Sequence, residues 1–123
     1  MIEESTNQLL AYFTLTFKEI ALQEHVSGTQ RRALDGFSKH AEYIKAFLIG
    51  QVGKNDQIAD NPLSIDLILD EGVYPIILDA QSLIGGRAVL LECEDTPSLI
   101  RLYERCGFKA LQKQELVQLF LIL

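Results

Sequence analysis

Residues that could perform chemistry gather in residues 84–108, where a short apolar segment separates a glycine pair from an acidic cluster. Glu92, Glu94 and Asp95 form this cluster. A carboxylate there could act as a general base, although acidic residues after a buried strand more often form a solvated loop. Tyr103 follows within the stretch LYERCGF, which ends a predicted helix at a glycine and an aromatic residue. This order indicates that a strand-to-helix junction positions the side chains.

Neither the histidines nor the cysteines form a recognisable metal or disulfide pattern. His25 and His40 lack metal-ligand spacing to cysteines or acidic residues, so we expect no metal site. Cys93 and Cys106 are the only cysteines, and without a secretory pattern we expect both to be reduced core residues.

Length and composition are typical of one domain, which we expect to span residues 1–123. The chain is 48% hydrophobic and 23% charged, and its formal net charge is -6. A net charge of this sign disfavours binding to the phosphate backbone of nucleic acids. The acidic N-terminus does not match a secretory signal and the apolar runs are too short to cross a bilayer, so we expect a cytoplasmic protein without a membrane span.

The first part of the chain predicts two strands and a connection between them. Residues 8–20 and 41–52 are rich in aromatic, β-branched and aliphatic residues, and we expect these two strands to pair. Residues 23–41 are polar and irregular, which predicts a long connection.

A helix is predicted next. Asn61 and Pro62 are typical of a helix start, and the apolar spacing that follows continues to Ile84. We expect Pro75 to kink or break this helix near its middle, because proline removes one intrahelical hydrogen bond. Gly85 and the glycine after it end the pattern.

The last part of the chain predicts a buried strand, a helix and two further strands. Residues 87–93 form a nearly continuous apolar run, typical of a strand that is buried on both faces. Thr96 should cap the following helix, with Pro97 at its first position and Gly107 at its end. The tail supplies the strands FKAL and ELVQLFLIL. The order strand, strand, helix, strand, helix, strand, strand predicts an α/β fold with a mixed sheet.

This order, together with three segments, resembles the GNAT superfamily of acyl-CoA N-acyltransferases. The segments are YFTL at 12–15, LIGQ-x-x-KND at 48–56 and GGR-x-x-x-LECED at 85–95, and the match covers nearly the whole chain. The resemblance implies a GNAT-like fold and acetyl-CoA as the cofactor. It also implies transfer of an acetyl group to a primary amine of unknown identity.

The resemblance assigns a catalytic role to one side chain. Tyr103 matches the tyrosine that donates a proton to the departing CoA thiolate. In the plainer alternative, its ring packs under the sheet and its hydroxyl faces water. Apart from the resemblance, Glu92 is the member of the acidic cluster that we expect to serve as the general base for the amine, directly or through water. Arg101 and Arg105 would either meet CoA phosphates or form surface ion pairs.

The resemblance also implies a cofactor site along the second strand. The backbone of Val52, Gly53 and Lys54 would pair with the pantetheine arm after this strand splays from its neighbour. The alternative is a simple strand end with a glycine bulge. Thr96 stands where many relatives carry an asparagine that contacts the cofactor.

The pyrophosphate loop departs from the family pattern. Its counterpart is QIADNP, in which Asp60 and Pro62 occupy the usual glycine positions; the aspartate adds like charge and the proline removes an amide. Gln57, and the backbone amides of Leu63 and Ser64 at the helix start, remain as cofactor-binding groups.

The chain is also shorter than a complete member of the family, because the strand and two helices that come first in the GNAT fold, and the strand after them, have no counterpart. A competing hypothesis is therefore a non-catalytic interaction protein that keeps the GNAT scaffold but has a degenerate CoA site. Under this hypothesis the apolar tail ELVQLFLIL would be an exposed pairing edge, whereas burial in its own sheet is the plainer alternative. We expect a homodimer under both hypotheses.

Overall fold

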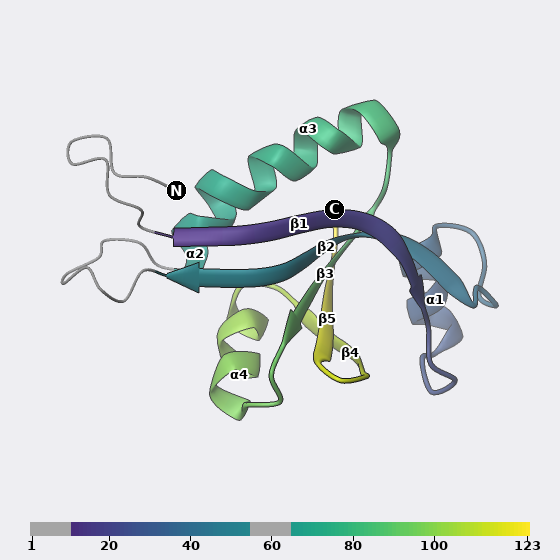
Figure 1. The fold of residues 1–123 in the computed structure, drawn as a ribbon. Coiled ribbons are helices and arrows are strands. Elements are labelled where there is room, and N and C mark those ends of the chain that lie inside the picture. Colours follow the sequence, from purple (N-terminus) through teal and green to yellow (C-terminus); the bar gives the residue numbers. More distant parts are fainter. Residues whose placement is uncertain (1–10, 55–64) are drawn as a thin grey trace, which may run out of the picture.

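The short apolar strand β3 (Ala88–Cys93) lies at the centre of the sheet in the computed structural model, which describes residues 11–54 and 65–123 (Figure 1). The sheet has five strands in the order β1-β2-β3-β5-β4. β2 and β3 are parallel, and the other neighbours are antiparallel. The remaining strands are β1 (Ala11–Ala21), β2 (Tyr43–Lys54), β4 (Lys109–Lys113) and β5 (Val117–Ile122).

Two hydrophobic clusters lie on opposite faces of this sheet, and β3 contributes to both. Val89, Leu91 and Cys93 point into the first cluster, whereas Ala88 and Leu90 point into the second. Alternate residues of a strand face opposite sides, so a strand covered on both faces must be apolar throughout. The prediction of a doubly buried strand at 87–93 is confirmed, as is the antiparallel pairing of the first two strands.

The helices are divided between the two faces. Residues of the π-helical segment η1 (Ile68–Val73), α3 (Tyr74–Ile84) and α4 (Pro97–Arg105) pack in the first cluster, with α2 (Ile65–Leu67) at its edge. The helix α1 (Gly28–Asp35) contributes to the second cluster. The predicted fold class is therefore confirmed: the protein is a mixed α/β structure.

The prediction of an irregular connection over residues 23–41 is wrong, because this segment contains α1. Ser27 caps the helix by accepting a hydrogen bond from the Gln30 amide, and Gly36 ends it with a φ of 99°. Leu34 is the only buried residue of the helix. One apolar position cannot produce a periodic pattern, so the sequence signal consists of the caps alone.

Arg31 holds the two ends of this segment together. Its guanidinium donates hydrogen bonds to the backbone carbonyls of Gln23, Val26 and Ala41. Charge-assisted hydrogen bonds are stronger than neutral ones. A single side chain therefore ties the end of β1, the start of α1 and the approach to β2 into one unit.

The predicted break at Pro75 takes the form of a change in helical hydrogen bonding. The π-helical segment η1 comes directly before it, and Pro75 occupies the first turn of α3, where a missing amide costs little. The predicted start at Asn61 and Pro62 lies outside the described residues.

The tail strand β5 is an interior strand, paired with β3 on one side and β4 on the other. The hypothesis that ELVQLFLIL is an exposed pairing edge is therefore wrong, because its own sheet buries it. The edges of the sheet are β1 and β4. No helix in the described ranges is both long and apolar enough to span a membrane.

Gly86 lies in the connection between α3 and β3, against packed aromatic side chains. Its φ is +111°, and a Cβ there would lie 2.8 Å from a ring carbon of Phe47 and 3.0 Å from one of Phe17. These two rings pack together with centroids 4.7 Å apart. The neighbouring Gly85 also has a positive φ, of +78°, but a Cβ there would meet no atom within 4 Å.

We expect Gly86→Ala to destabilise the protein more than Gly85→Ala. Both variants introduce backbone strain, but only the first forces a methyl group against packed aromatic rings, a penalty of about 1–3 kcal/mol in addition to the strain. Chemical denaturation of both variants measures the difference. Equal losses in the free energy of unfolding would contradict the prediction, because they would show that the Phe17 and Phe47 rings shift to accommodate the methyl group at little cost.

Candidate active site

β2 and β3 run side by side over a short distance and then separate. Their parallel pairing covers only Ala46–Ile49 of β2 and 88–91 of β3. Beyond this point β2 continues to Lys54 paired with β1, and β3 continues to Cys93 paired with β5. In the described part of the chain, the facing edges of the two strands therefore have no strand partner beyond Ile49 and Leu91.

A β-bulge in β2 lies at the point of separation. Thr14 of β1 is opposite Gln51 and Leu15 is opposite Ile49, so Gly50 is an extra residue without a partner on β1. A Cβ at Gly50 would lie 3.1 Å from the Thr14 hydroxyl oxygen. A bulge bends its strand and shifts the alternation of side chains. The bulge lies at Gly50, within β2, and the pairing with β3 ends beside it; the prediction that the backbone of Val52, Gly53 and Lys54 binds the cofactor stays a prediction.

The shift in alternation places Val52 in the same core cluster as Ile49 and Tyr103. Without the extra residue, the alternation that puts Ile49 in this cluster would turn Val52 to the other face. The backbone of Gly53 and Lys54 continues β2 opposite Tyr12 and Ala11. The other predicted cofactor-binding residues Gln57, Leu63 and Ser64 lie outside the described residues.

Tyr103 is the one buried residue of α4 and is only 7% exposed. Its ring contacts Phe108 edge to face, with centroids 6.4 Å apart. The turn at Gly107, with a φ of +99°, brings Phe108 back so that its amide donates to the Tyr103 carbonyl at 3.2 Å. The predicted helix end at Gly107 is confirmed, and it explains the sequence LYERCGF.

The environment of Tyr103 keeps its hydroxyl protonated. Burial raises the pKa of this phenol, and the nearby Cys93 and Cys106 thiols raise it further. The hydroxyl makes no hydrogen bond to any residue of the described ranges. No buried side-chain nitrogen or oxygen of the described residues lacks a hydrogen-bond partner, so this hydroxyl is accessible to solvent, and a protonated phenol there can donate a proton or a hydrogen bond to a group that enters the site.

A second set of polar residues, which the sequence analysis did not single out, surrounds the end of α4. The Cys106 thiol donates a hydrogen bond to the Asp66 carboxylate of α2 at 3.2 Å. Burial, followed by this hydrogen bond, raises the pKa of the Cys106 thiol to about 11. Burial, with nearby Cys106, Asp70 and Asp66, raises the pKa of Tyr74 to about 12. Asp66 and Tyr74 lie two helical turns apart, but nothing in the sequence relates them to α4.

Cys93 ends β3 within the same cluster as Tyr103 and is buried. Burial and the charge of Asp95 raise the pKa of its thiol. Cys93 and Cys106 are both free, as predicted. Their raised pKa values favour the protonated thiol over the thiolate in both residues.

Glu92 lies on the opposite face of the sheet from Tyr103, because it alternates with Leu91 and Cys93. Its carboxylate accepts a hydrogen bond from the Gln118 side chain at 3.1 Å. Gln118 in turn accepts one from Gln112 at 2.7 Å, and both glutamines are buried. The two predicted catalytic side chains therefore lie on either side of the sheet, at the level where β2 and β3 separate.

The rest of the acidic cluster is a solvated loop. Asp95 pairs with Lys113 at 2.9 Å, and both side chains are more than half exposed. Thr96 occupies the cap position of α4, and Pro97 lies in its first turn as predicted, but the Thr96 side chain makes no capping hydrogen bond. Thr96 therefore lies at the predicted N-cap position, but the prediction that its side chain caps the helix is wrong.

The arginines of α4 are free of ion pairs with the described residues. Arg101 and Arg105 are both exposed and lie with Glu104 around a shallow hollow. The predicted surface pairs with Glu104 or Glu94 do not form. Within residues 11–54 and 65–123, no three histidine, cysteine or acidic side chains are grouped so that they could hold a metal ion.

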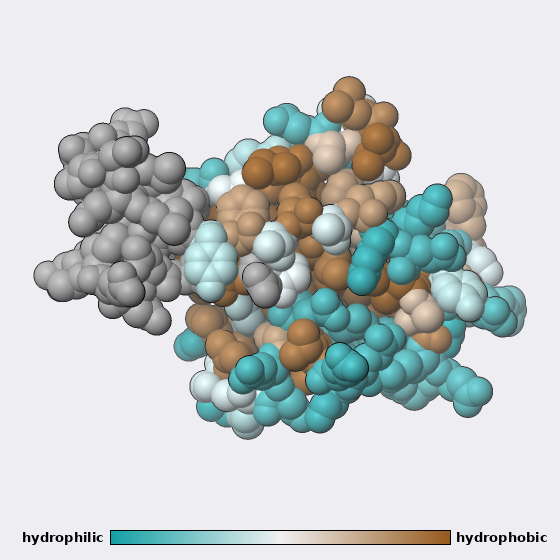
Figure 2. Space-filling model, in the orientation of Figure 1, coloured by the Kyte–Doolittle hydropathy of each residue, from teal (hydrophilic) through white to brown (hydrophobic). Residues whose placement is uncertain are grey.

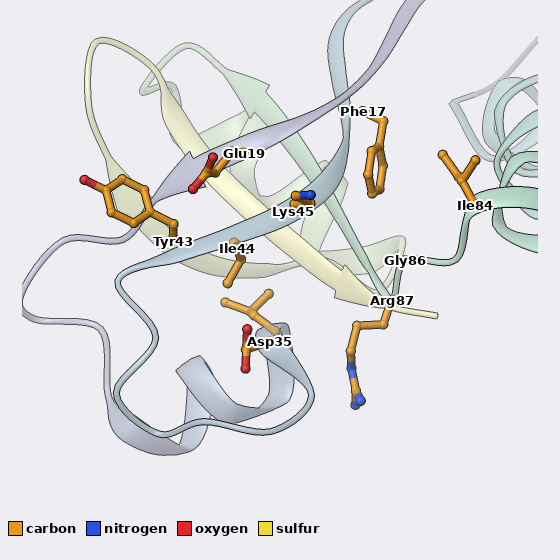
Figure 3. A pocket seen from close by; sticks show the side chains of 10 residues that line it. Phe17, Glu19, Asp35, Tyr43, Ile44, Lys45, Ile84, Gly86 and Arg87 are labelled. Carbon is orange, nitrogen blue, oxygen red and sulfur yellow. The ribbon is translucent and has the colours of Figure 1, made fainter.

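A larger hollow, of about 560 Å³, lies at the other end of the parallel strands (Figure 3). Phe17 and Ile84 line one side of it, and Lys45 and Arg87 contribute positive charge. The start of β2 and the residues just before β3 form its floor. Because β2 and β3 separate at their opposite ends, this hollow is not part of the candidate active site.

No family model and no curated protein matches the sequence. Solved structures do match. AtaT complexed with acetyl-methionyl-tRNAfMet matches with a TM-score of 0.71 and 16% identity over 98% of this chain and 67% of that chain. A crystal structure of a bacterial toxin matches with a TM-score of 0.66 and 19% identity, over 98% of this chain and 64% of that chain.

A mutant of KacT matches with a TM-score of 0.64 and 16% identity, over 92% of this chain and 62% of that chain. This chain therefore spans about two thirds or less of the length of these neighbours. AtaT and KacT are GNAT-fold acetyltransferases. At this level of identity the match shows the fold, and the predicted GNAT-like fold is confirmed.

We expect Asp66→Asn to lower the pKa of the Cys106 thiol. The carboxylate accepts the thiol hydrogen bond and opposes a nearby thiolate, so its removal favours the charged form. In a Cys93→Ser background, the pH midpoint of Cys106 alkylation should fall from about 11 toward the ordinary value of 9. Mass spectrometry follows the reaction.

Asp70→Asn is the matched control, because Asp70 has the weakest raising effect on Cys106. Its midpoint should move less than that of Asp66→Asn. Equal midpoints in the parent and the Asp66 variant would contradict the hydrogen bond between α4 and α2.

Proposed function

We propose that this chain is a GNAT-type N-acetyltransferase domain that transfers an acetyl group from acetyl-CoA to a primary amine in the cytoplasm. The observation that carries the proposal is the separation of β2 and β3 at the Gly50 bulge, with Tyr103 in the core cluster that Val52 also joins. The neighbours support the cofactor, since AtaTR was crystallised with acetyl-CoA bound.

The cofactor would bind along the inner edge of β2. The backbone of Val52, Gly53 and Lys54 would pair with the amide groups of the pantetheine arm in the manner of an additional strand. Gln57 and the amides of Leu63 and Ser64 would contact the pyrophosphate. Thr96 would contact the cofactor from the start of α4, where its hydroxyl is not used as a cap.

The reaction would proceed by direct attack. The amine nitrogen forms a bond with the thioester carbonyl carbon, and backbone amides near Val52 stabilise the negative charge on the carbonyl oxygen. The carbon–sulfur bond then breaks, and the sulfur leaves as a thiolate that takes the proton of the Tyr103 hydroxyl. The raised pKa of Tyr103 ensures that this proton is present at neutral pH.

The base would be Glu92, acting directly or through a water molecule. It is the first residue of β3 beyond the pairing with β2, which ends at Leu91, and Gln118 orients its carboxylate. Its position opposite Tyr103 suits a reaction in which the amine approaches from one face and the thiolate is protonated on the other.

The acceptor amine belongs to one of three classes: a small amine, an aminoacyl group or a protein amine. AtaT was solved with acetyl-methionyl-tRNAfMet, a tRNA that carries an acetylated aminoacyl group. The net charge of -6 favours cationic acceptors in this chain.

An interaction protein on a GNAT scaffold is the second candidate. It is favoured by the aspartate and the proline that stand in QIADNP at the usual glycine positions of the pyrophosphate loop. Binding of acetyl-CoA separates the two candidates, because they predict the same fold.

We expect calorimetric titration with acetyl-CoA to show saturable binding in the micromolar range. In turnover assays on a panel of amines, Tyr103→Phe should lower kcat about 10²-fold with little effect on acetyl-CoA affinity, because it removes a proton donor but keeps the ring. Tyr43→Phe is the control, since Tyr43 is exposed at the far end of β2.

Two results would count against the enzyme. If no heat is released at millimolar acetyl-CoA, the chain does not bind the cofactor by itself, and the interaction protein becomes the better explanation. If Tyr103→Phe turns over as fast as the parent, the proton donor is another group.

A further inference from the structure

The hollow at the far end of the parallel strands takes no part in the proposed acetyl transfer (Figure 3). Its volume of about 560 Å³ falls within the roughly 300–1,000 Å³ that small-molecule sites occupy. Three parts of the fold converge on it: the start of β2 with β1 opposite, the end of α1, and the connection from α3 to β3. The hollow is therefore large enough for a small metabolite.

The start of β2 leaves main-chain groups beside the hollow. The pairing of β2 with β3 begins at Ala46, opposite Ala88. Tyr43, Ile44 and Lys45 come before this point and line the hollow. On the side toward β3, these three residues have no strand partner in the described part of the chain. Backbone amides and carbonyls on this side can pair with polar groups of a bound molecule.

Apolar side chains form one side of the hollow. The Phe17 ring packs on Phe47 with centroids 4.7 Å apart but stays 37% exposed, and Ile84 is 61% exposed. Figure 3 shows Phe17 and Ile84 on the same side of the hollow. Figure 2 shows apolar residues gathered over α3, with hydrophilic residues bordering them toward α1. Exposed aromatic and aliphatic surface within a hollow favours a ligand that has an apolar part.

Charged side chains of both signs form the rest of the wall. Lys45 and Arg87 are cationic, and Glu19 and Asp35 are anionic. Asp35 accepts a hydrogen bond from the Ser38 amide at 3.0 Å. Glu19 lies directly opposite Lys45 on the paired strands, yet neither side chain, nor that of Arg87, forms an ion pair or hydrogen bond within residues 11–54 and 65–123. A ligand of a single charge would leave groups of the other sign unpaired, so a zwitterion complements this wall best.

Arg87 lies against the turn that ends α1. Gly36 forms this turn with a φ of +99°, and a Cβ there would lie 3.0 Å from the Arg87 Nη1 atom. The missing side chain at Gly36 thus leaves room for the guanidinium beside the negative end of the α1 dipole. Arg87 remains exposed, and its planar fork of N–H donors can bind a carboxylate through two parallel hydrogen bonds.

We propose that this hollow binds a small zwitterion with an apolar side chain, of the chemical class of α-amino acids and dipeptides. The carboxylate of the ligand pairs with Arg87 and its ammonium with Glu19, while its side chain packs against Phe17 and Ile84. Figure 3 shows Glu19 and Arg87 on different sides of the hollow, which suits a ligand whose two charges are separated. In a dipeptide, the peptide group would pair with the free main-chain edge at the start of β2.

This inference does not rest on the proposed acetyl transfer. The hollow lies where the pairing of β2 and β3 begins, at Ala46, whereas the candidate active site lies where this pairing ends, beyond Ile49. Binding of the zwitterion needs no acetyl-CoA. Failure of acetyl-CoA binding therefore leaves this prediction unchanged, and failure of zwitterion binding leaves the proposed chemistry unchanged.

Calorimetric titration of the full chain without acetyl-CoA tests the proposal, with L-leucine and L-leucyl-L-leucine as probes. We expect saturable binding with a Kd below about 1 mM for at least one of them. N-acetylation and C-amidation of the tighter probe should each weaken binding about fivefold or more, because each removes a charge that the wall pairs. The tighter probe identifies the source of the zwitterion, an amino acid or a dipeptide.

Two variants test the two charges separately. Arg87→Met should abolish the difference between the free and the amidated probe, and Glu19→Gln should abolish the difference between the free and the acetylated probe. The matched controls are Arg101→Met and Glu115→Gln, which remove the same charges at exposed positions outside the hollow and should bind like the parent. Glu92→Gln should also bind like the parent, because Glu92 does not line the hollow.

Three results would each overturn the proposal, once circular dichroism has verified that every variant is folded. The first is the absence of heat with both probes at about 10 mM. The second is equal affinity for the free, acetylated and amidated probes. The third is loss of binding in Glu92→Gln with retention in Arg87→Met and Glu19→Gln, which would place the zwitterion in the candidate active site.

Discussion

Gly50 is the extra residue that separates β2 from β3, and the arrangement around the candidate site depends on it. A strand with one residue more than its neighbour must bend and shift its alternation. β2 therefore stays paired with β1 while it leaves β3 after Ile49. The same shift turns Val52 into the core cluster that contains Tyr103. The bulge at Gly50 thus lies where β2 and β3 stop pairing, and the β2 side chain that follows it, Val52, packs against the apolar core cluster.

The two faces of the sheet carry different side chains beside the point where β2 and β3 separate. On one face, helices cover an apolar core in which burial keeps Tyr103, Cys93 and Cys106 protonated. On the other face, a chain of buried amides runs from Gln112 through Gln118 to the Glu92 carboxylate. Buried polar groups persist only when they are hydrogen-bonded, so this chain fixes the carboxylate in one orientation.

Most of the fold could be predicted because its signals are local. The apolar run at 87–93 specifies a doubly buried strand, and Pro97 and Gly107 mark the ends of α4. α1 was missed because it buries a single residue, and it is held by hydrogen bonds from Arg31 to distant carbonyls. The tail could be read either as a pairing edge or as a strand buried in its own sheet, because a sequence shows strand character but not the number of neighbours, and the structure bears out the second.

The sequence by itself determined most of the strands and helices, although not α1, and it singled out Tyr103, since propensity and periodicity act within a few residues. Only the tertiary structure decided that Tyr103 and Glu92 lie on opposite faces, that Asp66 meets Cys106, and that the tail strand β5 lies between β3 and β4. These facts depend on strand order and on contacts between segments far apart in the chain. Such contacts arise when the elements pack together, and no local pattern specifies them.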